Sequence, residues 1–137
     1  MADAQCLCGA LKLKSQQPSK LVVACHCFAC QRRTGSPFSV GAFYAIDTVE
    51  ISGAATEFVR VGDSGRRVRI YFCPTCGSTV YWKPDALPSM IGVAVGALAD
   101  AKTSTAWKVS KSSRRLASIS AIAGPVPAAR SNRRVKR

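Results

Sequence analysis

Seven cysteines in three short clusters constrain this chain more than any other feature of its sequence. The clusters have the patterns C-x-C-G, C-x-C-x-x-C and C-x-x-C-G, and their members are Cys6 and Cys8; Cys25, Cys27 and Cys30; and Cys73 and Cys76. Thiols at such spacings can converge on one metal ion, and four thiolates close a tetrahedral zinc site whereas three leave a position open. The count of seven therefore predicts one closed, structural zinc site and one open site that is available for chemistry.

The clusters can be divided between two sites in two ways. In the favoured division, the first and last clusters form a four-cysteine site, and the middle cluster grips a second ion by itself. The competing division joins the first cluster to the middle one and leaves Cys73 and Cys76 as a dithiol with redox potential. An odd number of cysteines argues against a fully paired disulfide framework. In a reducing cytosol, clustered cysteines are more often metal ligands than disulfides.

An open zinc position in the middle cluster has chemical consequences. The metal can hold an incoming thiol as a thiolate nucleophile, or polarise a carbonyl oxygen as a Lewis acid. Three protein ligands also predict a labile metal, unless His26, water or a distant side chain supplies a fourth. His26 is the single histidine, and it lies between two proposed ligands. Because adjacent residues rarely bind one ion together, we expect it to form hydrogen bonds near the metal rather than to ligate it or act as an acid–base.

Composition and charge divide the chain into two parts. Residues 1–101 are expected to form one globular domain with a modest core, since they carry ten basic residues against seven acidic ones and the whole chain is 47% hydrophobic. Residues 102–137 contain ten Lys or Arg and no acidic residue, which predicts a basic, flexible tail. Neither a signal peptide nor a run of roughly 18 apolar residues is evident, so we expect a soluble, cytoplasmic protein without a membrane partner.

Runs of β-branched residues between turn signals predict a mainly β class, with antiparallel sheets and metal knuckles at the sheet ends. Residues 62–65 have the composition of a hairpin loop, and Gly41 is expected to mark a β-bulge. No long amphipathic helix is evident. The expected strands are 38–46, 48–52, 56–61, 66–72, 79–82 and 90–98.

The three motifs, in this order, resemble the glutathione-dependent formaldehyde-activating enzyme family. The resemblance includes Q-R-R-T-G after the middle cluster, F-S-V-G at 38–41 and I-G-V-A-V-G-A-L at 91–98, and it covers roughly residues 5–101. The family in turn resembles centromere protein V, which functions by binding rather than by a known reaction. Family members usually continue with an aromatic- and proline-containing segment. Here Trp107 is the single aromatic residue after Trp82, as in a diverged or frameshifted end.

The resemblance implies a β-tent fold of small antiparallel sheets, with a structural zinc on the first and last clusters and a catalytic zinc on the middle one. It implies a carbon–sulfur lyase reaction, in which glutathione and formaldehyde form S-hydroxymethylglutathione. Arg32 and Arg33 directly follow the middle cluster and are candidates to contact the carboxylates of glutathione. Tyr81 and Trp82 either flank a pocket or, as we favour, pack in the core near the last cluster.

Two other functions are compatible with these residues. The chain can be a non-catalytic zinc-binding module whose basic tail binds nucleic acid or another polyanion. Such binding would be nonspecific and salt-sensitive, because the tail has a dense basic cluster without interleaved aromatic residues. The chain can also be a thiol redox protein that uses Cys73 and Cys76. The basic cluster consists of Arg130, Arg133, Arg134, Lys136 and Arg137.

Overall fold

The computed structural model describes residues 2–98 and 111–113, and these residues form two β-sheets with three short helices. None of the helices in these residues is long and apolar enough to cross a membrane. The elements in chain order are β1 (Ala2–Gln5), β2 (Lys12–Ser15), β3 (Leu21–Cys25), α1 (Phe28–Thr34), β4 (Ser39–Ala45), η1 (Ile46–Thr48), β5 (Val49–Ser52), β6 (Thr56–Val61), β7 (Arg67–Phe72), β8 (Thr79–Pro84), β9 (Met90–Ala94), η2 (Val95–Leu98) and β10 (Lys111–Ser113).

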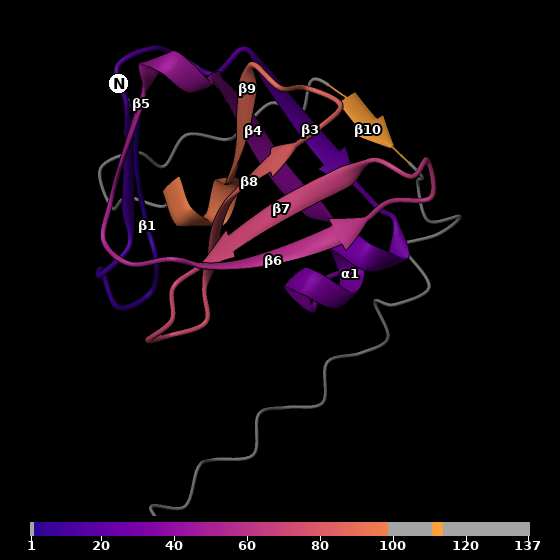
Figure 1. Cartoon of the computed structure of the whole chain (residues 1–137), viewed down its shortest axis with the longest axis horizontal. Coiled ribbons are helices and arrows are strands. Elements are labelled where there is room, and N and C mark those ends of the chain that lie inside the picture. The colour runs from indigo at the N-terminus through magenta and orange to yellow at the C-terminus, as the bar shows by residue number, and fades with distance from the viewer. Residues whose placement is uncertain (1, 99–110, 114–137) are drawn as a thin grey trace, which may run out of the picture.

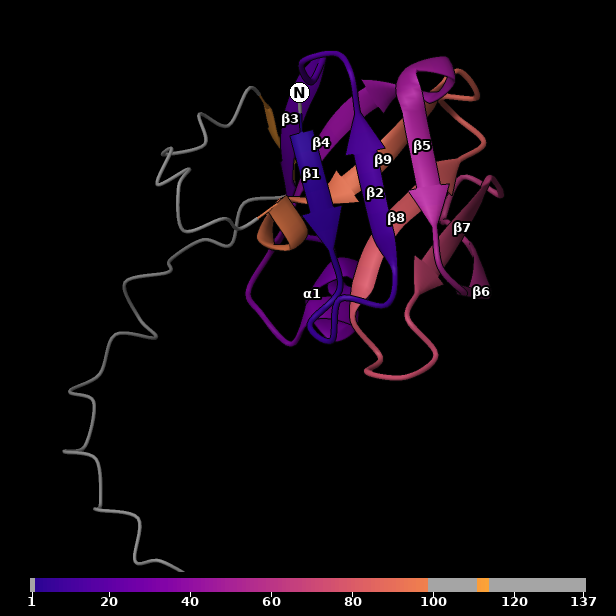
Figure 2. The same cartoon turned by 90° about the vertical axis from the view of Figure 1, so that its left-hand side faces the viewer.

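The two sheets differ in size and lie face to face, as Figures 1 and 2 show. The small sheet has the order β1-β2-β5, and the large sheet has the order β10-β3-β4-β9-β8-β7-β6. All neighbouring strands are antiparallel except β10 and β3, which are parallel. The predicted mainly β class of antiparallel sheets is confirmed. Apart from β10, the basic segment 102–137 lies outside the described residues.

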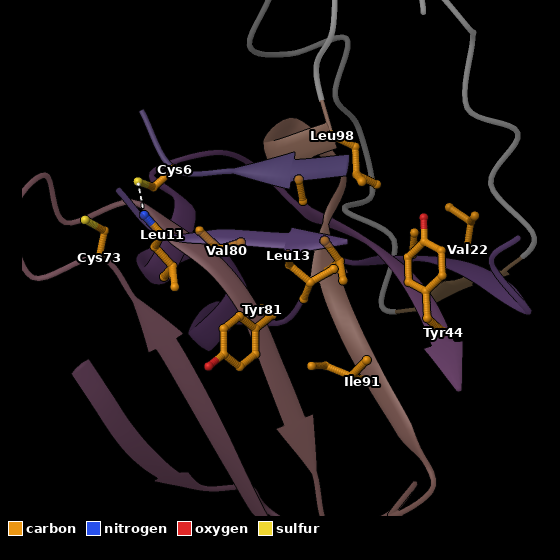
Figure 3. Close-up of a cluster of buried hydrophobic side chains, with 13 residues drawn as sticks. Cys6, Leu11, Leu13, Val22, Tyr44, Cys73, Val80, Tyr81, Ile91 and Leu98 are labelled. Atoms are coloured by element: carbon orange, nitrogen blue, oxygen red, sulfur yellow. Dashed lines mark hydrogen bonds between the residues drawn. The ribbon is translucent and has the colours of Figure 1, made fainter. Parts of the chain in front are cut away.

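The core fills the space between the two sheets because strand residues alternate between two environments. In β2, Leu13 is fully buried whereas Lys12 and Lys14 point to solvent. The large sheet contributes Tyr44 and Ile91, which are also fully buried, and Figure 3 shows these side chains converging. The buried cluster consists of Ala4, Cys6, Leu11, Leu13, Val22, Ala42, Tyr44, Cys73, Val80, Tyr81, Ile91, Val93 and Leu98.

The expected strands agree with the structure at most positions. The strand expected at 56–61 is β6, and it pairs with β7 across the loop predicted at 62–65. The strand expected at 90–98 ends at Ala94, where η2 begins. β1, β2 and α1 were not predicted from the sequence; the two strands have four residues each, and the helix has seven.

Gly41 does not mark a β-bulge, because β4 pairs with both neighbours in continuous register through this residue. Its role is steric instead. The indole of Trp82 on β8 lies across β9 and β4, and a Cβ added at Gly41 or Gly92 would come within 2.4 Å of an indole atom. Glycine at these two positions therefore lets a large aromatic ring lie flat against the sheet.

Gly92→Ala is expected to lower the free energy of unfolding by roughly 1–3 kcal/mol, because the added methyl group overpacks against the indole. Gly96→Ala is the matched control, since no heavy atom lies within 4 Å of its added Cβ. Urea unfolding of the metal-loaded variants measures the difference. Equal stability of the two variants would contradict the steric role of glycine beneath Trp82.

Candidate metal centres

Cys6, Cys8, Cys73 and Cys76 form a four-thiol group whose sulfur atoms all lie within 4.8 Å of one another. The Cys6 and Cys8 sulfurs are 3.5 Å apart, and those of Cys8 and Cys73 are 3.7 Å apart. Tetrahedral zinc with Zn–S bonds near 2.3 Å requires sulfur–sulfur distances of about 3.8 Å. The group therefore fits a closed tetrahedral metal site. In this structure Cys6 and Cys8 lie with the last cluster, not with the middle one as the competing division required.

Two glycines in left-handed conformation build the loops of the four-thiol group. Gly9 and Gly77 have φ angles of 77° and 73°, which glycine adopts without strain. Their backbone N–H groups donate to the carbonyl oxygens of Cys6, at 3.0 Å, and Cys73, at 2.8 Å. The N–H of Leu11 also donates to the Cys6 sulfur at 3.2 Å, as Figure 3 shows. These bonds hold the two cysteine loops in the shape that brings the sulfurs together.

The four-thiol group lies at the edge of the core and joins the two sheets. Cys6 follows β1 of the small sheet, and Cys73 follows β7 of the large sheet. Both side chains are buried, with exposures of 2% and 0%. The Cys76 sulfur lies 3.3 Å from the hydroxyl oxygen of Ser78. Hydrogen bonding by Ser78 lowers the pKa of Cys76 to about 5, which favours the thiolate that a metal requires.

Cys25, Cys27 and Cys30 form a three-thiol group where β3 leads into α1. Cys25 ends the strand, and Cys27 caps the helix, its sulfur accepting the N–H of Cys30 at 3.4 Å. The amide Nε2 of Gln31 donates to the carbonyl oxygen of His26 at 2.8 Å and ties the helix to the connecting segment. All three cysteines are half-buried. Three thiols held by a strand end and a helix start leave one side of a tetrahedral ion open.

Electrostatics in the three-thiol group favour a bound cation. Burial raises the pKa of Cys30 to about 12, and the neighbouring Cys25 and Cys27 act in the same direction. A cation offsets both effects, since it attracts each thiolate and replaces the lost hydration. The donor chemistry of this group therefore also fits a thiophilic metal ion such as zinc.

His26 lies outside the three-thiol group although it sits between two of its members in the sequence. Its side chain is buried, and its ring packs against Phe38 with the centroids 5.2 Å apart. Among the described residues, the donor atoms that come together here are the three cysteine sulfurs, and the ring nitrogens of His26 are not part of the group. The structure thus gives His26 a packing position beside the group.

An apolar cavity of about 230 Å³ opens next to the three-thiol group. Cys25 and Cys30 are among its lining residues, which also include Phe43, Ile70 and Trp82. The cavity lies on the face of the large sheet opposite the core, because alternate residues of β3 and β4 point into it. Val23 and Gly41 face the cavity, whereas their neighbours Val22 and Ala42 belong to the core.

A second hollow, which we call the arginine groove, has a volume of about 620 Å³. Its lining residues come from α1, the β6–β7 hairpin and the end of β8, and Figure 1 shows where these elements lie. Cys27 lines the groove, so the three-thiol group has a member on each hollow. Arg60 lines both hollows. The arginines of the groove are Arg32, Arg60, Arg66 and Arg67.

The two arginines singled out from the sequence occupy different hollows. Arg32 lines the arginine groove, and Arg33 lines the apolar cavity. One guanidinium nitrogen of Arg33 donates to the hydroxyl oxygen of Ser39 at 2.6 Å, and the group lies 4.7 Å from the Trp82 ring centre. Arg60, Arg66 and Arg67 were not predicted, because their distance from the cysteines in the sequence gave no signal of proximity.

Tyr81 and Trp82 have separate environments. Tyr81 is buried in the core and stacks on Tyr71 with the ring centres 4.6 Å apart, in line with the expected core packing. Trp82 lines the apolar cavity instead, against that expectation. Successive strand residues point to opposite faces of a sheet, so one residue of a neighbouring pair can lie in the core and the other in a pocket.

The fold and the two thiol groups define a two-sheet β protein with two candidate metal centres. The chain matches the model of the glutathione-dependent formaldehyde-activating enzyme family over residues 1–112, and it belongs to this family. Among solved structures, it is similar to the crystal structure of a Rhodobacter sphaeroides protein, with a TM-score of 0.59 and 21% identity. That similarity covers 81% of this chain and 99% of the other, and it shows a shared fold. No curated protein matches the chain.

Cys73→Ser is expected to remove the metal of the four-thiol group and to lower the melting temperature by roughly 10 °C or more, because the core loses its cross-link. Cys27→Ser is expected to remove the other metal with a much smaller change in melting temperature, since it is half-buried at a helix cap. Each variant should fall from two zinc ions per chain to one. Zinc analysis and thermal unfolding measure both properties.

Thr75→Ser is the control for the loss of Cys73, since it lies within the same C-x-x-C turn and is exposed. It should leave both the zinc content and the melting temperature unchanged. Equal melting temperatures for Cys73→Ser and Cys27→Ser would contradict the different roles of the two groups.

Proposed function

We propose that this protein is a zinc-dependent enzyme of the carbon–sulfur lyase type, which joins glutathione or a similar thiol to formaldehyde or a related small aldehyde. The product with formaldehyde is S-hydroxymethylglutathione. The observation that carries the proposal is the position of the three-thiol group between two hollows, one lined by four arginines and a single acidic residue, Asp63, and one mainly apolar. Membership of the family supports the same chemistry.

Cys25, Cys27 and Cys30 would hold the catalytic zinc, and the four-thiol group would hold the structural one. When bound, the catalytic ion supplies a positive charge that stabilises the substrate thiol as a thiolate at neutral pH. The position of this charge is set by the ligands at the end of β3 and at the start of α1, and backbone hydrogen bonds fix both of these elements. A thiolate held there is the nucleophile that attack on an aldehyde requires.

The reaction is an addition without oxidation or reduction. The thiolate sulfur forms a bond to the carbonyl carbon, the carbon–oxygen π bond breaks, and its electron pair moves to oxygen, which then takes a proton. Negative charge therefore develops on that oxygen, and a preorganised donor near it lowers the barrier. We assign this role to Arg33, which lines the cavity and whose guanidinium contacts Ser39 and Trp82.

The arginine groove suits the remainder of glutathione, which carries two carboxylates. Arg32, Arg60, Arg66 and Arg67 offer several guanidinium groups along the path that begins at Cys27. Guanidinium binds carboxylate through paired, charge-assisted hydrogen bonds. We therefore assign the thiol substrate to this groove and extend the expected glutathione contacts from Arg32 to its three neighbours.

A redox dithiol is less well supported, because Cys73 and Cys76 lie in one group with Cys6 and Cys8. The proposed tail contacts with nucleic acid or another polyanion fall on residues outside those that the structure describes.

The zinc-loaded protein is expected to accelerate adduct formation between glutathione and formaldehyde over the spontaneous rate. Exchange NMR at equilibrium measures the rate directly. Cys27→Ser should return the rate to the spontaneous value, since it removes one of three ligands. A fully loaded protein that gives no acceleration would overturn the substrate assignment.

The double variant Arg32→Ala/Arg66→Ala is expected to raise the KM for glutathione roughly threefold to tenfold, since exposed ion pairs contribute up to about 1 kcal/mol each. Lys12→Ala/Lys14→Ala removes the same charge from the exposed face of β2 and should leave KM unchanged. Both should behave like wild type with 2-mercaptoethanol, which has no carboxylate. A similar change with both thiols would argue against carboxylate binding in the groove.

A further inference from the structure

The apolar cavity holds far more space than formaldehyde fills. We infer that the aldehyde substrate of this enzyme carries an apolar substituent, with an aryl aldehyde such as benzaldehyde as the class that fits best. This inference rests on the proposed function, since it assigns the second substrate of the same reaction. It concerns the cavity rather than the arginine groove.

The volume of the cavity sets the size of the occupant. A protein cavity of about 150 Å³ with an apolar lining accommodates benzene. The cavity beside the three-thiol group measures about 230 Å³, which leaves room for an aldehyde group in addition to a ring. Formaldehyde has one carbon atom and would leave most of this volume to water against apolar walls.

The walls of the cavity determine the chemistry of the occupant. Phe43 and Ile70 are buried, and Trp82 is held flat across the sheet above Gly41 and Gly92. Phe43 and Trp82 meet edge to face, with ring centres 6.1 Å apart. A pocket bounded by two aromatic rings and aliphatic side chains favours a flat apolar group.

The polar groups of the cavity determine how such a molecule would lie. The thiols of Cys25 and Cys30, the Arg33 guanidinium and the Ser39 hydroxyl all line it, and Ser39 is only 6% exposed. An aldehyde whose ring rests against the aromatic walls can therefore direct its carbonyl oxygen to Arg33. Its carbonyl carbon then faces the thiolate, and the addition gives a hemithioacetal with the same balance of atoms and electrons as for formaldehyde.

Leu87 gives a way to test the cavity without disturbing the core. It lies between β8 and β9, is 40% exposed, and lines the cavity. Leu87→Trp is expected to fill part of the cavity and to lower kcat/KM for benzaldehyde with glutathione at least tenfold more than it lowers the value for formaldehyde, because the one-carbon aldehyde needs less of the cavity. Ile51→Trp on β5 is the matched control, because Ile51 is 39% exposed and does not line the cavity.

Binding can be measured apart from catalysis with benzyl alcohol, which has the ring but no carbonyl group. Saturation-transfer NMR on the zinc-loaded protein should show contact with benzyl alcohol in wild type and Ile51→Trp, and its loss in Leu87→Trp. Acceleration of formaldehyde addition alone, without benzyl alcohol binding, would overturn the inference and leave the proposed function standing. Acceleration of neither aldehyde would overturn the proposed function, and with it the assignment of an aldehyde to the cavity.

Discussion

The convergence of four cysteine sulfurs is the constraint on which the rest of this structure depends. The strands of the small sheet are only four residues long, and such a sheet has little apolar surface with which to hold its partner. The four-thiol group joins the small sheet to the large one through Cys8 and Cys73, residues 65 positions apart in the chain. A bound metal would close this long loop and fix the spacing that the core between the sheets requires.

One face of the large sheet packs in the core, and its other face lines the cavity of the candidate site. This division explains why β4 is apolar at nearly every position, since Ala42 and Tyr44 face the core while Gly41 and Phe43 face the cavity. The two glycines under Trp82 belong to the same arrangement. They keep the indole close to the sheet, and the position of the indole in turn supports Arg33 beside the three-thiol group.

The parts of the fold that depend on local patterns could be predicted from the sequence. The run of β-branched residues at 66–72 predicted β7, and the turn residues at 62–65 predicted the hairpin loop before it. The cysteine spacings predicted two groups of four and three, because metal geometry restricts how thiols can converge. Contacts between residues far apart in the sequence could not be predicted in this way. No local pattern around Arg60 or Trp82 indicated that β6 and β8 would bring them beside Cys25 and Cys30.

The pairing of β10 with β3 supports the strand that carries the first cysteine of the three-thiol group. β3 ends at Cys25, and in the parallel register Ser113 lies opposite this cysteine. Without β10, β3 would be the bare edge of the large sheet, with a row of unpaired backbone groups ending at the first thiol. The strand that delivers Cys25 is therefore reinforced by a segment almost ninety residues later in the chain, within its basic part. A force or a binding partner that pulled on that basic segment would separate β10 from β3, beside the first thiol of the candidate active site.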